Sequence, residues 1–170
     1  VFDANYCYGS YLPGLAADDL ASEHKDDLKD GLYNFAVQSA QSSVIAPENS
    51  SKNNSARIVL SSLGDDDTVI WKVSHNGNYV TLQNYASGRY LDVDAGRAYR
   101  GAVVQQYAGN GSRAQKWIAI KNSDGSYTLR SGINSMLSLD LPSGSTAVGT
   151  KLQLWTDNGS SAQKYVLKTP

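Results

Sequence analysis

The sequence is poor in cysteine and histidine, and this shortage excludes several kinds of chemistry. Cys7 is the only cysteine, so no intrachain disulfide can form and stability must come from packing. A cysteine nucleophile needs a histidine as base, and neither His24 nor His75 stands at a spacing that indicates such a partner. We therefore interpret Cys7 as an inert thiol.

An excess of charge of one sign is also missing. The chain has 15 Lys and Arg against 16 Asp and Glu, for a formal net charge of −1, and the basic residues are scattered. Nucleic acids and anionic membranes select clustered positive charge, so we expect neither as a partner. No apolar run approaches the ~20 residues that span a bilayer or resembles the core of a signal peptide, so no transmembrane segment is predicted.

The composition fits one ordinary globular domain. Of the 170 residues, 41% are hydrophobic and 18% are charged, which is enough apolar material for a single core. Residues 1–30 differ from the rest, because Ala, Asp and Leu recur at helix-like spacing over residues 15–28. Pro13-Gly14 is typical of a turn before this helix, and Asp30-Gly31 of a stop after it. We expect residues 1–30 to be a short helical segment or a linker from a larger protein.

From residue 31 onward the sequence is typical of β structure. Short runs such as 79–82 and 151–155 are separated by Asn-Gly, Asp-Gly and Ser-Gly dipeptides, which favour tight turns. Segments this short cannot be the strands of parallel βαβ units. The sequence thus predicts an all-β fold over residues 31–170.

The most informative pattern is a repeat with an offset of 48 residues, in which GNGSRAQKW (109–117) matches DNGSSAQKY (157–165). The same offset pairs Asp92 with Asp140, Gln105 with Gln153, Tyr107 with Trp155, Asn110 with Asn158, and Gln115 with Gln163. An offset of 46 recovers an earlier copy, in which Gly31, Tyr33, Ile45 and Trp71 match Gly77, Tyr79, Leu91 and Trp117. The chain therefore contains three repeats, at 31–76, 77–124 and 125–170.

Three units of this length could fold as the blades of a propeller or as a closed threefold barrel. Propellers typically need at least about four blades, so three repeats fit the barrel. Gln115-Lys116-Trp117 and Gln163-Lys164-Tyr165, each preceded by an aliphatic-Gln-x-aromatic segment, resemble the Gln-x-Trp repeats of the ricin-type β-trefoil lectin family. The resemblance covers residues 31–170. It implies a β-trefoil with pseudo-threefold symmetry after the N-terminal helical segment.

The resemblance also implies sugar sites in the second and third repeats. In the ricin-type pattern an Asp after a strand Leu accepts bonds from sugar hydroxyls, and an aromatic residue fifteen positions later forms the floor of the site. These positions hold Asp92 with Tyr107, and Asp140 with Trp155. Gln105 and Gln153, two residues before each aromatic, also match the pattern. Recognition of a sugar ring requires a fixed acceptor for neighbouring hydroxyls, an aromatic face for the apolar side of the ring and amides that fix its orientation.

This sequence departs from the family pattern just before the Gln of Gln-x-Trp, where Ala114 and Ala162 replace the usual Asn. Our hypothesis is that Asn110 and Asn158, upstream on the same loop, reach the sugar instead. Gln115 and Gln163 are interpreted as structural support that satisfies buried backbone or orients the Asp. The aromatic residues at the end of each repeat are expected in the threefold core: Trp71, Trp117 and Tyr165.

The first repeat lacks these side chains. Its equivalents of the acid, Gln, aromatic, Asn and second Gln are Ala46, Val59, Ser61, Gly64 and Val69. Since acceptor and floor are both missing, we predict two sugar sites and a first repeat that serves folding alone.

No catalytic residue, metal site or cofactor is expected. Asp92-x-Asp94-x-Gly96 resembles the start of a calcium loop but lacks its later ligands. A glycosidase needs two carboxylates about 5 to 10 Å apart, and threefold geometry should hold Asp92 and Asp140 farther apart than that.

The function expected is non-catalytic binding of glycans, with the galactose-like or xylan-like sugars that are usual in the family. The start at Val1 fits a processed product or an excised piece, and Phe2-Asp-Ala-Asn-Tyr resembles segments of modular, secreted Gram-positive proteins. We therefore expect a secreted or cell-surface bacterial protein, tethered to a catalytic or cell-wall domain. The alternatives are a trefoil that binds or inhibits proteins, and an accessory domain of a glycoside hydrolase.

Overall fold

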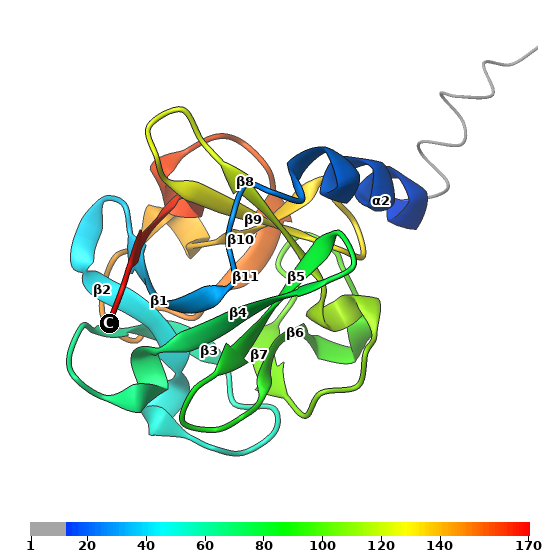
Figure 1. Cartoon of the computed structure of the whole chain (residues 1–170). Coiled ribbons are helices and arrows are strands. Elements are labelled where there is room, and N and C mark those ends of the chain that lie inside the picture. Colours follow the sequence, from blue (N-terminus) through cyan, green and yellow to red (C-terminus); the bar gives the residue numbers. More distant parts are fainter. Residues whose placement is uncertain (1–12) are drawn as a thin grey trace, which may run out of the picture.

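The computed structural model describes residues 13–170, and the predictions about Cys7 and the segment 2–6 lie outside them. Among the described residues a single α-helix, α2 (Pro13–His24), precedes twelve strands (Figure 1). The strands are β1 (Gly31–Val37), β2 (Ala40–Pro47), β3 (Ile58–Ser62), β4 (Trp71–Asn76), β5 (Tyr79–Asn84), β6 (Tyr90–Val93), β7 (Val104–Tyr107), β8 (Trp117–Lys121), β9 (Tyr127–Ser131), β10 (Leu137–Asp140), β11 (Gln153–Thr156) and β12 (Tyr165–Lys168).

The strands form a closed barrel with three attached hairpins. Antiparallel pairing runs from β1 through β4, β5, β8, β9 and β12 and returns to β1, so the barrel has no open edge. The hairpins β2–β3, β6–β7 and β10–β11 come one from each repeat. This arrangement confirms the predicted β-trefoil.

One aromatic side chain from each repeat fills the core on the pseudo-threefold axis. Each is fully buried, and each donates a hydrogen bond to a backbone carbonyl in its own repeat. The bonds run from Trp71 Nε1 to Ile45 O (3.0 Å), from Trp117 Nε1 to Leu91 O (3.1 Å) and from Tyr165 OH to Leu139 O (3.1 Å). The three residues predicted as core therefore share one packing role, and each ties the end of its repeat to the strand before the hairpin turn.

The helix differs from its expected limits at both ends. Pro13 and Gly14, where a turn was predicted, are already helical, and proline is tolerated in the first turn of a helix because an N–H there has no intrahelical partner. The helix ends at His24, and the following turn carries Leu28 into the main core, where that side chain is 3% exposed. Burial of Leu28 at the barrel therefore overrides the helical periodicity that extended to residue 28.

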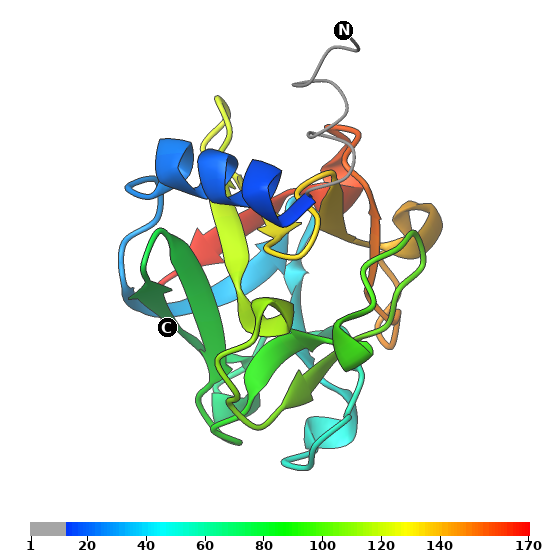
Figure 2. The same ribbon diagram turned by 90° about the vertical axis from the view of Figure 1, so that its right-hand side faces the viewer.

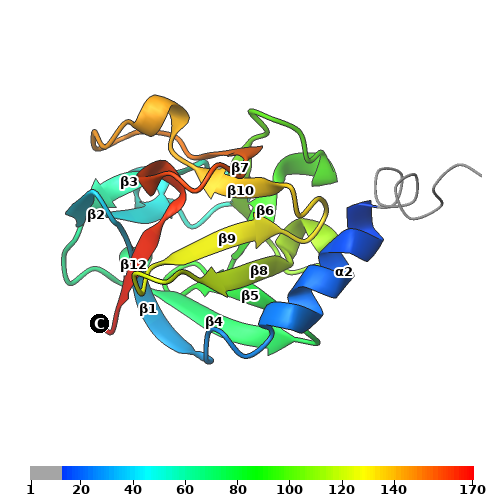
Figure 3. The same cartoon turned by 90° about the horizontal axis from the view of Figure 1, so that it is seen from above.

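Helix α2 packs on the outside of the barrel beside β8 (Figures 2 and 3). Ala17 and Ala21 are fully buried against Ile118 and Tyr79. Small side chains on the helix let its backbone lie close to the strands. The N-terminal segment is thus docked against the second repeat.

Candidate functional site

The hairpin register pairs the predicted acid with the predicted glutamine in both later repeats. Asp92 lies opposite Gln105 in β6–β7, and Asp140 lies opposite Gln153 in β10–β11. Cross-strand partners have side chains on the same face of the sheet. Gln105 Nε2 therefore donates to Asp92 Oδ1 at 3.1 Å, and Gln153 Nε2 donates to Asp140 Oδ2 at 2.9 Å.

A second glutamine completes each network from a short 3-10 turn before the core aromatic. Gln115 Nε2 donates to Asp92 Oδ2 and to Ala108 O, both at 2.9 Å, while its Oε1 accepts from the Asn110 N–H at 3.2 Å. This side chain therefore binds the acid and the loop together.

Gln163 does the same in the third repeat. Its Nε2 donates to Asp140 Oδ1 and to Thr156 O, both at 3.0 Å, and its Oε1 accepts from the Asn158 N–H at 2.9 Å. The two networks thus match bond by bond.

Both acids are buried with capacity to accept further bonds. Asp92 is 3% exposed and Asp140 is 4% exposed. Burial raises the pKa of each carboxyl above its ordinary value, and the hydrogen bonds from the two glutamines oppose that shift. Each carboxylate oxygen accepts one amide bond and keeps a second lone-pair direction. The arrangement presents a fixed acceptor for hydroxyl groups.

A pocket of about 700 Å³ opens beside Asp92, and we call it the second-repeat site. The predicted residues Asp92, Gln105, Tyr107 and Asn110 all line it. Tyr107 is 38% exposed, so its ring is accessible at the end of strand β7.

A pocket of about 640 Å³ beside Asp140 is the third-repeat site. Asp140, Gln153, Trp155 and Asn158 line it, and Trp155 is 39% exposed. Every residue that lines this pocket has its counterpart 48 positions earlier in the second-repeat site. The predicted offset of 48 residues therefore relates every residue that lines the third-repeat site to a residue of the second-repeat site.

One wall of each pocket is formed by residues outside the predicted set of site residues. In the two pockets this wall is the 3-10 turn Asp94–Gly96 or Pro142–Gly144. Ala95 and Ser143 both have φ of 54°, a left-handed conformation that costs a non-glycine residue roughly 1–2 kcal/mol. The sequence contained a signal for this turn, because Ala95-Gly96 and Ser143-Gly144 are small residues followed by glycine 48 positions apart. Ala95-Gly96 lies in the segment that we compared with a calcium loop.

Asn110 and Asn158 lie in the pockets but already have a local role. Their side-chain oxygens accept from the Ser112 and Ser160 N–H groups at 3.0 Å, which closes a turn. Their side-chain NH₂ groups are what remains for a ligand. Contact with a sugar stays a prediction for both residues.

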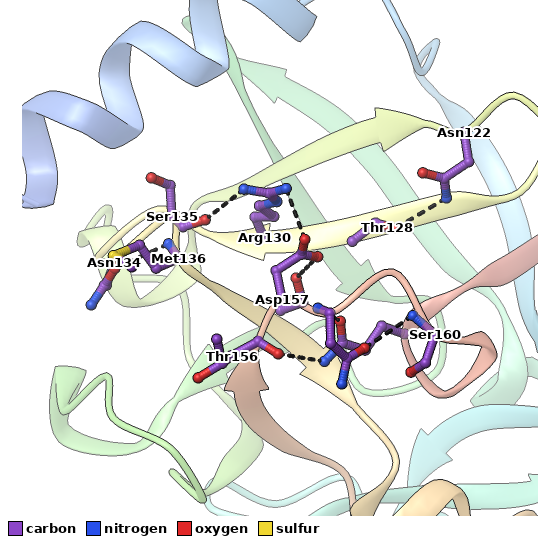
Figure 4. A network of polar contacts seen from close by, with 12 residues as sticks. Asn122, Thr128, Arg130, Asn134, Ser135, Met136, Thr156, Asp157 and Ser160 are labelled. Atoms are coloured by element: carbon purple, nitrogen blue, oxygen red, sulfur yellow. Dashed lines mark hydrogen bonds and ion pairs between the residues drawn. The ribbon is translucent and has the colours of Figure 1, made fainter.

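The loop that follows Trp155 and strand β11 has an anchor that sequence reasoning did not find. Arg130 Nη2 contacts Asp157 Oδ2 at 2.9 Å, and Ser138 Oγ donates to Asp157 Oδ1 at 2.8 Å (Figure 4). The second repeat has Gly109 at the position of Asp157, so this anchor belongs to the third repeat alone.

The first repeat has an apolar cluster where the others have the network. Ala46 lies opposite Val59 in β2–β3, in the register of Asp92 with Gln105. Ala46 and Val69 are buried in a cluster with Ala36 and Val44. These side chains supply no acceptor, and the absence of sugar binding by this repeat stays a prediction.

Residues 13–170 contain neither a cluster of metal-ligating side chains nor a membrane-spanning helix. No group of three or more His, Cys, Asp or Glu side chains there is placed to hold a metal ion. No helix among these residues has the length and apolar character needed to cross a membrane.

Comparison with protein families gives a match over residues 67–155, more than half of the chain, to the family described as ricin-type beta-trefoil lectin domain-like. A search of curated proteins found no match.

Several solved structures share the fold. ThreeFoil, a designed 3-fold symmetric protein, has a TM-score of 0.79 and 27% identity, and the match covers 83% of this chain and 100% of ThreeFoil. An exo-beta-1,3-galactanase from Clostridium thermocellum has a TM-score of 0.77 and 28% identity, over 82% of this chain but only 30% of the galactanase. A Macrolepiota procera ricin B-like lectin, solved in complex with lactose, has a TM-score of 0.70 and 21% identity over 82% of this chain and 96% of the lectin.

Proposed function

Because the chain belongs to the ricin-type β-trefoil lectin-like family, whose fold supports carbohydrate binding, we propose that it binds glycans through the second-repeat and third-repeat sites. The observation that carries this proposal is the duplicated pocket, with its buried acid, paired amides and exposed aromatic ring. The family is generally non-catalytic, and we propose that this chain is also a binding module without an active site.

Each site would hold a sugar from two sides. The carboxylate of Asp92 or Asp140 accepts bonds from neighbouring hydroxyls, and these bonds are strong because the acceptor is charged. The ring of Tyr107 or Trp155 supports the apolar face of the sugar. Gln115 positions the acid and does not need to touch the ligand.

We propose galactose-like or xylan-like sugars as ligands. The lactose bound to the Macrolepiota procera lectin and the galactan specificity in the name of the bacterial relative support the galactose side of this choice. Two weak sites on one rigid barrel gain avidity on a repeating glycan when the spacing of its sugars matches that of the sites.

We also propose that the module belongs to a larger secreted or cell-surface protein and directs it to glycans. The similarity to less than a third of the Clostridium thermocellum galactanase supports this modular role. The proposal includes attachment to a catalytic or cell-wall domain.

A glycan array followed by calorimetry tests the proposed function. Asp92→Ala and Asp140→Ala should each remove one site, and the double variant should lose all binding. Ser61→Ala alters the equivalent of the aromatic position in the first repeat, so this control should bind as the unaltered protein does. Silence of the folded protein towards galactosides, xylans and bacterial wall polymers would reject the proposal. Capture of a partner that persists after its glycans are removed would favour protein recognition instead.

A further inference from the structure

We infer that the third-repeat site selects saccharides that carry a carboxylate or sulfate group, whereas the second-repeat site takes neutral sugars. The residue that makes this difference is Arg100 of the second repeat, whose guanidinium lies over Trp155, the aromatic residue of the third-repeat site. The inference rests on the proposed carbohydrate binding and assigns a ligand class to one of its two sites.

Each hairpin is flanked by a loop from the preceding repeat. Three equivalent backbone bonds hold these loops in place: Ser55 N–H to Gln106 O, Gly101 N–H to Leu154 O, and Gly149 N–H to Leu60 O, each at 2.8 Å. The residue before each donor therefore occupies one equivalent position beside each hairpin. That residue is Asn54 beside the second-repeat site, Arg100 beside the third-repeat site and Val148 beside the apolar first repeat.

These residues differ in charge and in how their side chains are used. The Asn54 side-chain oxygen accepts from the Ala108 N–H at 2.9 Å, so this neutral amide is part of the loop structure. The Arg100 guanidinium lies 5.8 Å from the centre of the Trp155 ring. Among residues 13–170 it has no hydrogen bond or ion pair. Its five N–H donors are therefore available beside the sugar-stacking ring.

Neither acid of the third-repeat hairpin and the loop after it pairs with Arg100. Asp157, on the loop that follows strand β11, is paired with Arg130 at 2.9 Å and bonded to Ser138. Asp140 is buried between its two glutamines. Arg100 therefore keeps its positive charge next to Trp155 without an ion-pair partner among residues 13–170.

The second-repeat site has a cation as well, but this one is paired. Arg113 lines the pocket, and its guanidinium donates to both carboxylate oxygens of Asp18 on helix α2 at 3.0 Å. It also donates to Tyr79 OH and to Gly132 O, each at 3.0 Å. A bound anion would have to compete with Asp18 there. The two sites thus share their floor and acceptor and differ in the charge at the rim.

The contact with Trp155 is at the outer limit of cation–π range. The guanidinium lies over the Trp155 ring at this distance, so the cation stands next to the ring at which we propose that the sugar is bound. A planar carboxylate can accept two parallel N–H bonds from arginine, and a sulfate offers similar oxygens. Since a charge-assisted bond contributes about 1.5–3 kcal/mol, we expect at least about tenfold tighter binding of the acidic ligand.

The test measures only the third-repeat site, in the Asp92→Ala background. Calorimetry compares lactose with sialyllactose, a xylo-oligosaccharide with its glucuronic acid derivative, and galactose with a sulfated galactose. These three pairs distinguish a sialate, a uronate and a sulfate as the source of the anion. At least one acidic member should bind about tenfold more tightly than its neutral partner, and added salt should reduce the difference.

Arg100→Asn should abolish this preference while leaving the affinity for the neutral sugar within about twofold, because the acceptor and floor remain. Lys72→Asn removes the same charge from an exposed position on β4 and should leave the preference intact. Asn54→Arg in the Asp140→Ala background should create a preference for the acidic sugar at the second-repeat site.

Two outcomes overturn the inference in different ways. Binding of the neutral sugars without preference for any acidic partner, or a preference that survives Arg100→Asn, would reject the role of Arg100 and leave the proposed function standing. Binding of no sugar at all by the folded protein would reject both.

Discussion

Replacing Gln163 by valine should destabilise the protein by about 3 kcal/mol, although the valine side chain is apolar and suits a buried position. Gln163 is fully buried and makes three hydrogen bonds, to the Asp140 carboxylate, to Thr156 O and from the Asn158 N–H. The bond to the charged group contributes about 1.5 kcal/mol and each backbone bond about 1 kcal/mol or less. Valine also leaves the buried acid with a single protein donor, so the pKa of Asp140 should rise further.

Two additional substitutions should recover part of this loss. The triple variant Asp140→Ala, Gln153→Val and Gln163→Val copies the residues of the first repeat into the third. Because the buried charge leaves together with its donors, only the two loop bonds and some packing volume are lost, and we expect a cost of about 1.5 kcal/mol. The variant with three changes should therefore be more stable than the variant with one.

Urea unfolding followed by tryptophan fluorescence measures both effects. With an m-value of about 2 kcal/mol/M, the midpoint should fall by about 1.5 M for the single variant and by about half as much for the triple variant. The m-values should match that of the unaltered protein, which checks that the change is in stability. A triple variant at least as unstable as Gln163→Val would refute the reasoning, because it would show that the acid and its amides stabilise the fold.

Four other predictions rest on the same structure. Acidification should weaken sugar binding with a midpoint above pH 3.8, because burial raises the pKa of Asp92 and Asp140 and a protonated acid is a weaker acceptor; calorimetry from pH 7 to pH 3.5 checks this. The folded state holds these protons more tightly than the unfolded chain, so the two groups contribute most to stability below pH 3.8, and urea midpoints should show this contribution lost as the pH rises through the raised pKa values. Trp155→Ala should reduce affinity at the third-repeat site at least about tenfold and change the unfolding free energy by less than about 1 kcal/mol, since the ring is 39% exposed; a large loss of stability would show that the ring belongs to the core. Tyr165→Phe should cost about 1–2 kcal/mol in urea unfolding by leaving the buried Leu139 carbonyl without its 3.1 Å bond, and an unchanged midpoint would contradict this role.

Much of the fold could be predicted because the chain repeats itself. Residues related by an offset of 46 or 48 occupy equivalent positions in a threefold structure. Identical residue types at that offset therefore predicted equivalent positions in the fold. The burial of Trp71, Trp117 and Tyr165 follows from that equivalence, whereas the pairing of Asp92 with Gln105 appears only in the register of the β6–β7 hairpin. The periodicity of helix α2 was less reliable, since the burial of Leu28 at the barrel ended the helix four residues early.

The sequence by itself determined the trefoil, the two repeats that carry an acid with an aromatic residue, and the apolar replacement of that set in the first repeat. Only the tertiary structure decided what surrounds each pocket. Arg100 reaches Trp155 across a repeat boundary, and Asp18 on the N-terminal helix binds the arginine that lines the second-repeat site. The physical reason is that repeat identity fixes contacts within a repeat, whereas the charges at each rim come from loops and a helix whose neighbours are set by closure of the barrel.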